Sequence, residues 1–271
     1  MTWWQAVLLG LVEGITEYLP VSSSAHLLVT QRILGIQADA SANAFAICIQ
    51  AGAIAAVLGL YRERVGRMVR GVLGRDTGGR NLVIALGIAF LPAMVIGGLF
   101  DDAIEATLFG VWPIVAAWAV GGVFLLMFSQ RRPPTDGAGL DELPWRHALA
   151  IGLAQCLAMW PGTSRSLVTI VAGLLVGLSM PAALEFAFLL GVITLGAATA
   201  FKALGHGAEM VATYGAFNVA LGFVVAWLSA AAAVQWMVTW LQRRGLAIFG
   251  YWRLFAAICV GTMAATGWIA P

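Results

Sequence analysis

Six stretches of the chain are nearly uninterrupted runs of apolar residues. Each is close to the length of about 20 residues that a helix needs to cross the hydrocarbon core of a bilayer. A surface helix of a soluble protein would show an apolar stripe beside a polar face, whereas these stretches are apolar all round. They predict six transmembrane helices, at residues 40–61, 82–100, 111–130, 182–201, within 210–242, and at 254–270.

Two further apolar stretches, 2–35 and 147–177, are each broken by a proline, Pro20 in the first and Pro161 in the second. Proline removes a backbone hydrogen bond and clashes with the preceding turn, so neither stretch predicts one continuous helix. We expect each to form a re-entrant hairpin, in which one helix enters the membrane and a second returns to the same side. Such a break is tolerated only where protein or a water-filled cavity shelters it.

The two predicted hairpins resemble each other in sequence, and each is followed by three spans. Because three is odd, the second hairpin would enter from the opposite face of the membrane. The chain therefore predicts a single all-α polytopic membrane domain, 1–271, with an inverted-topology repeat, 1–130 and 147–271, and a site near the midplane. The matched residues are Gly10 with Gly152, Glu13 with Gln155, Tyr18 with Trp160, and Ser22-Ser23 with Thr163-Ser164.

The charges are few and unevenly placed. Only 10% of residues are charged against 61% hydrophobic, and the net charge of +2 is too small to indicate a nucleic-acid partner. Twelve of the 15 basic residues fall in three joints, 62–80, 131–146 and 243–253. The positive-inside rule places these joints in the cytoplasm and the C-terminus outside. The three cysteines lie in apolar segments without metal-ligand spacing, which indicates no disulfide framework.

Glu13 and Glu17 lie in the first hairpin, in the run GLVEGITEYLPVSSSAH. Four residues apart on a helix, they share one face. An ionised side chain at mid-membrane costs at least about 2.5–3.5 kcal/mol, so two acids there indicate a functional site. Bare carboxylates repel phosphate, so the pair needs a divalent cation, a proton or Arg165 as its partner. A hard cation such as Mg²⁺ suits these oxygen ligands.

The second hairpin contains the turn Pro161-Gly162-Thr163-Ser164-Arg165-Ser166. Ser22 and Thr163 are predicted to cap the two returning half-helices. Two helix N-termini that meet at mid-membrane would offer free N–H groups to one anion. The Arg165 guanidinium suits bidentate phosphate binding, and Gly162 lets the backbone approach closely. The residues thus predict a phosphate cradle beside a carboxylate pair.

These two segments carry a resemblance to a known family. GLVEGITEYLPVSSSAH, together with PGTSRS followed by Thr169, resembles the two signature regions of the undecaprenyl-diphosphate phosphatases, also called bacitracin-resistance proteins. The resemblance implies hydrolysis of the lipid undecaprenyl diphosphate to undecaprenyl phosphate and inorganic phosphate, which recycles the lipid carrier of cell-wall synthesis and confers bacitracin resistance. It further implies a bacterial inner-membrane enzyme whose active site opens to the periplasm, a divalent cation (Mg²⁺ first, with Ca²⁺ or Mn²⁺ as alternatives), and a homodimer.

The resemblance, together with the residue chemistry above, suggests roles for residues of the two motifs. Two routes stay open: Ser23 attacks the terminal phosphorus, activated by His26 or a glutamate, or a metal-bound water attacks while Ser23 only holds phosphate. A transporter or flippase of a phosphorylated lipid or anion is the alternative function for the same midplane site.

The expected metal ligands are Glu13 and Glu17, the catalytic residues Glu17, Ser23, His26 and Arg165, and the substrate-binding residues Ser22, Ser24, Gly162, Thr163, Ser164 and Ser166.

Overall fold

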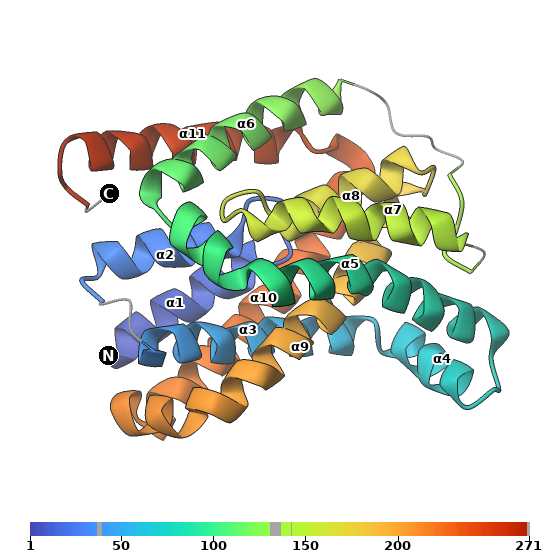
Figure 1. Cartoon of the computed structure of the whole chain (residues 1–271), viewed down its shortest axis with the longest axis horizontal. Coiled ribbons are helices and arrows are strands. Elements are labelled where there is room, and N and C mark those ends of the chain that lie inside the picture. The colour runs from blue at the N-terminus through green and yellow to red at the C-terminus, as the bar shows by residue number, and fades with distance from the viewer. Residues whose placement is uncertain (37–39, 131–136, 142, 270–271) are drawn as a thin grey trace.

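A computed structural model describes residues 1–36, 40–130, 137–141 and 143–269, and the regular elements in these ranges are helices. Arg131 and Arg132 of the second predicted joint lie outside the described residues. In chain order the elements are α1 (Trp3–Thr16), α2 (Ser23–Ile33), α3 (Ala40–Leu60), α4 (Arg62–Val72), α5 (Thr77–Leu108), α6 (Val111–Ser129), α7 (Trp145–Gln155), a short 3₁₀ helix η1 (Cys156–Met159), α8 (Arg165–Leu175), α9 (Met180–Tyr214), α10 (Ala216–Arg244) and α11 (Ala247–Ala265) (Figure 1).

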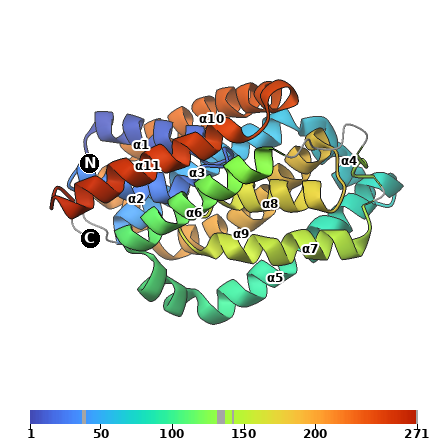
Figure 2. The same ribbon diagram turned by 90° about the horizontal axis from the view of Figure 1, so that it is seen from above.

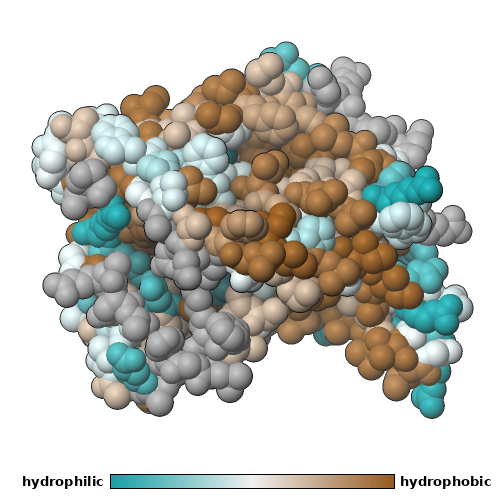
Figure 3. All heavy atoms as spheres, viewed as in Figure 1, coloured by the Kyte–Doolittle hydropathy of each residue, from teal (hydrophilic) through white to brown (hydrophobic). Residues whose placement is uncertain are grey.

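Six of these helices are long and apolar enough to cross a membrane, which confirms the six predicted spans. They are α3, α5, α6, α9, α10 and α11. Apolar residues cover the middle of the molecule in Figure 3, and hydrophilic residues lie towards its left-hand and right-hand ends. The chain is therefore a multi-pass helical membrane protein.

Two of the expected joints are continuations of the preceding span helix instead. α5 continues past residue 100 to Leu108, and α9 continues past residue 201 to Tyr214. Neither continuation contains a proline, so the helix keeps its own backbone hydrogen bonds until Gly215, with a φ of 79°, ends α9. Pro92 lies inside α5 instead, and Figure 2 shows α5 changing direction part-way along its length.

Each proline-broken stretch forms a pair of short helices. α1 and α2 are separated by a turn that holds Pro20, and α7 and α8 by η1 and a turn that holds Pro161. The pair α1–α2 lies at the end of the molecule with the N-terminus, and the pair α7–α8 extends from the opposite end (Figure 1). The two turns meet between them, at the centre of the molecule.

The broken pairs pack against spans from the other half of the chain. α1 makes its most extensive contact with α10, and α7 with α5. Small residues allow this: a Cβ at Gly10 would come within 2.6 Å of the Gly222 carbonyl oxygen, and one at Gly152 would overlap the backbone of Ala89. Close backbone approach at glycine is how helices pack tightly where lipid gives no hydrophobic drive. The halves are thus interlocked, which fixes the position of both central turns.

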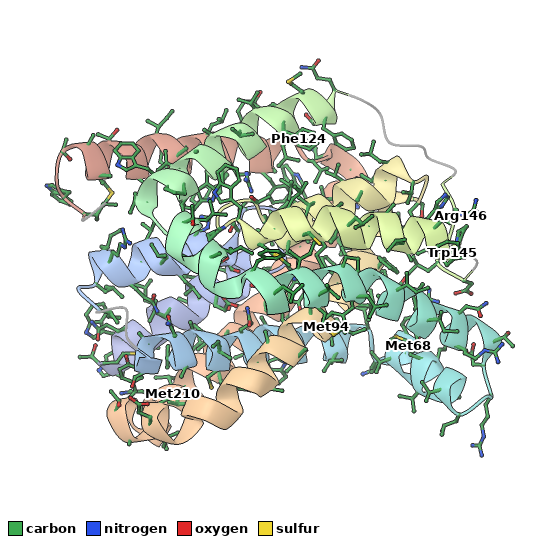
Figure 4. All side chains as sticks on the ribbon, viewed as in Figure 1. Met68, Met94, Phe124, Trp145, Arg146 and Met210 are labelled. Carbon is green, nitrogen blue, oxygen red and sulfur yellow. The ribbon has the colours of Figure 1, made fainter. Side chains whose placement is uncertain are left out.

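A network of ion pairs lies at the end of the molecule where α4 begins. Arg64 donates from Nε to Glu185 Oε1 at 2.6 Å and from Nη1 to Asp141 Oδ1 at 2.7 Å. The Gly79 N–H and the Arg67 guanidinium hold the pKa of Asp76 below its usual value. Trp145 and Arg146, at the start of α7, lie at the same end (Figure 4). This end carries most of the arginines that the sequence assigned to the cytoplasm.

Candidate active site

Direct hydrogen bonds join the two central turns. The Ser22 hydroxyl oxygen accepts from the Gly162 N–H at 3.2 Å, and the Ser166 hydroxyl donates to the Leu19 carbonyl at 2.9 Å. All four residues lie outside regular helix or in its first turn. The bonds therefore hold together the N-terminal ends of α2 and α8, as the sequence predicted for the two half-helices.

The residues that precede α2 and α8 have an unusual backbone. Ser22 has a φ of 74° and Ser164 a φ of 75°, in the left-handed region that non-glycine residues rarely adopt. Such a conformation costs on the order of 1–3 kcal/mol and is typical of functional sites. Ser164 caps α8 by accepting from the Leu167 N–H at 3.3 Å, so the prediction that Thr163 is the cap is wrong. Ser22 makes no side-chain cap of its own helix, because its hydroxyl bonds to Gly162.

A buried ion pair lies where the turns meet. Arg165 Nη2 donates to Glu17 Oε1 at 3.1 Å, and the Ser23 hydroxyl donates to Glu17 Oε2 through a short hydrogen bond. Arg165 Nη1 also donates to the Ala187 carbonyl at 3.1 Å, and a Cβ at Gly191 would overlap the guanidinium. The acidic helix and the arginine turn are thus brought together, and Glu17 links the serine to the arginine.

These groups line a cavity of about 210 Å³. Six of the predicted site residues face it: Glu17, Ser22, Ser23, Ser24, Ser164 and Arg165. The predicted substrate-binding residues Gly162, Thr163 and Ser166 do not, because their polar groups hold the two turns in place. The remaining lining residues are Gln50, Ala93, Gln155, Ala158, Met159, Thr194 and Leu195.

His26 lies away from this cavity. Its Nδ1 is 2.7 Å from the Ser22 carbonyl oxygen, and its Nε2 accepts from the Trp252 indole N–H at 3.0 Å. Because an indole N–H can only donate, Nε2 is unprotonated and Nδ1–H donates to Ser22. Both ring nitrogens are therefore occupied. The structure brings Ser23 to Glu17 and not to His26.

Arg253 is a residue that the sequence reasoning missed. The prediction placed it in a cytoplasmic joint, but it lies inside α11 and is fully buried. Charge counting cannot separate an arginine in a joint from one inside the first turns of a span; its place within the apolar run of α11 was the available signal. A Cβ at Gly121 on α6 would overlap its guanidinium, so that glycine makes room for it.

The Arg253 guanidinium donates only to backbone carbonyls among its described partners. The oxygens are those of Gly162 at 2.7 Å, Ala117 at 2.9 Å, Thr163 at 3.1 Å and Pro20 at 3.4 Å. Pro20 belongs to the first central turn, Gly162 and Thr163 to the second. One arginine therefore satisfies carbonyls of both turns at once and adds a positive charge beside them.

Glu13 and Glu17 are the residues that fit a divalent cation. Glu13 is 1% exposed, and its Oε1 has no hydrogen-bond partner. Across the described part of the chain no three His, Cys, Asp or Glu side chains come together as a metal site. Two hard carboxylate donors suit Mg²⁺, which keeps water or phosphate oxygens as its remaining ligands. Of the two carboxylates only Glu17 lines the cavity, so a cation held by the pair would meet a phosphorylated ligand at Glu17.

Comparison with known proteins gives the family. The profile described as bacitracin resistance protein BacA matches residues 6–259. The chain belongs to this family. A relative named undecaprenyl-diphosphatase, from Sorangium cellulosum, is 45% identical over 258 residues, which cover 94% of this chain and 84% of the relative. Another member, named undecaprenyl-diphosphatase 2, from Rhodospirillum rubrum, is 42% identical over 97% of this chain and 94% of its own length.

Replacement of the buried arginine is expected to destabilise the fold. Arg253→Met keeps an unbranched apolar chain but leaves carbonyls of both turns without donors, and each unsatisfied buried group costs about 1–3 kcal/mol. We expect a lower midpoint of thermal unfolding in detergent for Arg253→Met, with partial recovery in Arg253→Lys. The control is Arg243→Met, because Arg243 is exposed at the end of α10. An unchanged midpoint for Arg253→Met would show that the carbonyls do not need it.

Proposed function

We propose that this chain is an integral membrane phosphatase that hydrolyses undecaprenyl diphosphate to undecaprenyl phosphate and inorganic phosphate. The reaction would recycle the lipid carrier of cell-wall synthesis and so confer bacitracin resistance. Relatives named undecaprenyl-diphosphatase over nearly the whole chain support the proposal. The observation that carries it is the contact series Ser23–Glu17–Arg165 in one polar cavity, because it joins a nucleophile, a base and a cation.

In the proposed reaction the Ser23 oxygen attacks the terminal phosphorus. Glu17 accepts the hydroxyl proton, because its Oε2 already accepts the Ser23 hydrogen bond. An Oγ–P bond forms and the bond from phosphorus to the bridging oxygen breaks, which releases undecaprenyl phosphate. Water then cleaves the phosphoserine and frees inorganic phosphate. In the alternative route water attacks the terminal phosphorus directly, and Ser23 only holds the phosphate.

Arg165 and the starts of α2 and α8 are proposed to hold the terminal phosphate. Arg165 lines the cavity, and its Nε–H has no hydrogen-bond partner. Ser24 and Ser164 bring the first turn of α2 and the N-cap of α8 to the same cavity, where helix dipoles favour an anion. These donors would stabilise the charge that develops on the phosphoryl oxygens. In this proposal His26 is a positioning residue, because it bonds the carbonyl of Ser22, which precedes Ser23.

Glu13 and Glu17 are proposed to hold a divalent cation, with Mg²⁺ first and Ca²⁺ or Mn²⁺ as alternatives. The unpartnered Glu13 oxygen supports this. When bound, the cation would neutralise diphosphate charge as a Lewis acid. Arg165 pairs with Glu17, which offsets part of the repulsion between that carboxylate and an anionic substrate.

The two broken helix pairs are proposed to be re-entrant hairpins of an inverted-topology repeat. α1 and α7 both begin at a tryptophan, Trp3 and Trp145, and α2 and α8 are both 11 residues long. Their preceding serines share the same positive φ, and the pairs extend from opposite ends of the molecule (Figure 1). In the bacterial inner membrane, the arginine-rich end would face the cytoplasm and the active site would open to the periplasm. The homodimer stays a prediction from the resemblance.

Purified protein in detergent is expected to release inorganic phosphate from undecaprenyl diphosphate in the presence of Mg²⁺. Glu17→Gln is expected to lower kcat by about 10²–10⁴-fold, the range typical of a lost proton-transfer group. Ser23→Ala, which lacks the nucleophile, is expected to lower kcat by at least as much. Acid quenching with substrate labelled in the terminal phosphate should trap label on the wild type and not on Ser23→Ala. The matched control is Ser41→Ala, because Ser41 is buried and bonds Thr213 outside the cavity.

The outcomes of this assay separate the alternatives. Substantial turnover by Ser23→Ala would exclude serine attack and favour direct attack by water. If the wild type releases no phosphate while vesicles show movement of a phosphorylated lipid or anion, the transporter or flippase is correct instead.

Removal of divalent cations with a chelator is expected to stop phosphate release, and added Mg²⁺ should restore it. Glu13→Gln removes one charged ligand, so we expect the Mg²⁺ concentration for half-maximal rate to rise about tenfold or more. Glu63→Gln serves as control, because Glu63 is exposed on α4. Full activity in excess chelator would contradict the cation proposal.

The proposed orientation is tested by cysteine labelling in spheroplasts, in a background without Cys48, Cys156 and Cys259. Trp268→Cys lies at an exposed position after α11 and should react with a membrane-impermeant maleimide from outside. Arg75→Cys, exposed after α4, should react only after permeabilisation. The reverse pattern would overturn the orientation.

A further inference from the structure

The polar cavity has lining residues to which the proposed reaction assigns no role. Gln155, the last residue of α7, is 3% exposed and lines the cavity. Neither its Oε1 nor its Nε2 has a hydrogen-bond partner. Buried side-chain polar atoms are nearly always paired, and leaving one unpaired costs about 1–3 kcal/mol. An amide that is unpaired at both ends and lines a polar cavity indicates a partner that the chain itself does not supply.

The chemistry of Gln155 suits an anion that must later leave. A carboxamide offers two N–H donors and carries no charge. It occupies the place in the second half that Glu13 occupies in the first. A carboxylate there would add negative charge to a cavity that already holds Glu17 and would repel phosphate.

Gln155 lies next to the apolar lining of the cavity. Ala158 and Met159 follow it in the chain, and Ala93 on α5 lines the same space. Met94, beside Ala93 and labelled in Figure 4, is half-exposed on the outer surface of α5. α5 therefore contributes both to the cavity, through Ala93, and to the outer apolar surface, through Met94, where the polyprenyl chain of the substrate would lie.

Two further neutral groups line the cavity. On α3, Gln50 Oε1 accepts from the Thr199 hydroxyl at 3.3 Å. This hydrogen bond orients the Gln50 amide, and the two N–H donors are at its other end. Thr194 on α9 is the other. The cavity thus has two sets of polar groups: a charged set at the central turns and a neutral set of Gln155, Gln50 and Thr194.

We propose that Gln155 binds the phosphoryl group that stays on the lipid, with Gln50 and Thr194 completing a neutral subsite. This inference rests on the proposed phosphatase function. Gln155 comes from α7 and makes no hydrogen bond to Glu17, Ser23 or Arg165, so its two donors are free for a phosphoryl group other than the one that these three residues hold. A neutral donor binds the monophosphate product less tightly than a cation does, so it orients the substrate and still allows release.

The test is steady-state kinetics with product inhibition. Gln155→Leu keeps the side-chain volume and removes the proposed hydrogen bond to the phosphoryl group. Because a hydrogen bond to a charged group is lost, we expect KM to rise about tenfold or more. Inhibition by undecaprenyl phosphate should weaken by the same factor, while inhibition by inorganic phosphate stays unchanged. Gln155→Glu, with the same size and an added charge, should raise KM further, and its KM should fall as the pH is lowered.

Gln31→Leu is the matched control, because Gln31 also has a buried unpartnered Nε2 but does not line the cavity. Its kinetics should equal those of the wild type. Weaker inhibition by inorganic phosphate alone in Gln155→Leu would place Gln155 on the transferred phosphate and overturn the assignment. Unchanged inhibition by both products in an active enzyme would show that only water satisfies the amide. If Gln155→Leu does not fold, Gln155→Glu decides the outcome. If the wild type releases no phosphate, the proposed phosphatase function itself is contradicted.

Discussion

A break in a helix inside a bilayer leaves backbone carbonyls without partners, and nothing in the hydrocarbon can supply one. This chain places two broken helix pairs side by side at its centre, so the need for carbonyl partners arises twice at one point. Arg253 meets it by donating to Pro20, Gly162 and Thr163, while Ser22 and Ser166 form hydrogen bonds between the turns. The rest of the centre depends on this arrangement, because the turns position every group in the cavity.

Once the turns are fixed, the ion pair between Arg165 and Glu17 follows from their positions. Glu17 is buried and the Arg165 side chain is only 12% exposed, so either alone would be a poorly compensated charge in a low-dielectric interior. Paired, they cancel most of that cost and orient the carboxylate towards Ser23. The same contact thus contributes to stability and to the chemistry proposed for the cavity.

The sequence predicts the parts of this structure that depend on local pattern. The six spans follow from the length of their apolar runs, and the meeting of Arg165 with Glu17 follows from the cost of isolated charge. Partner choice across the fold does not follow. His26 is adjacent to the serines in sequence, but Trp252 and the Ser22 carbonyl occupy its ring, and only the packing of α11 shows this. Arg253 was assigned by counting charges, which ignores depth within a helix.

The glycines opposite the two buried arginines have a consequence beyond packing. Gly191 faces the Arg165 guanidinium and Gly121 faces that of Arg253, and a methyl group at either position would displace the cation. Each arginine and its glycine therefore form one steric unit shared by two helices. A larger residue at Gly191 alone would therefore shift the Arg165 guanidinium and disturb its ion pair with Glu17, although Gly191 does not itself line the cavity.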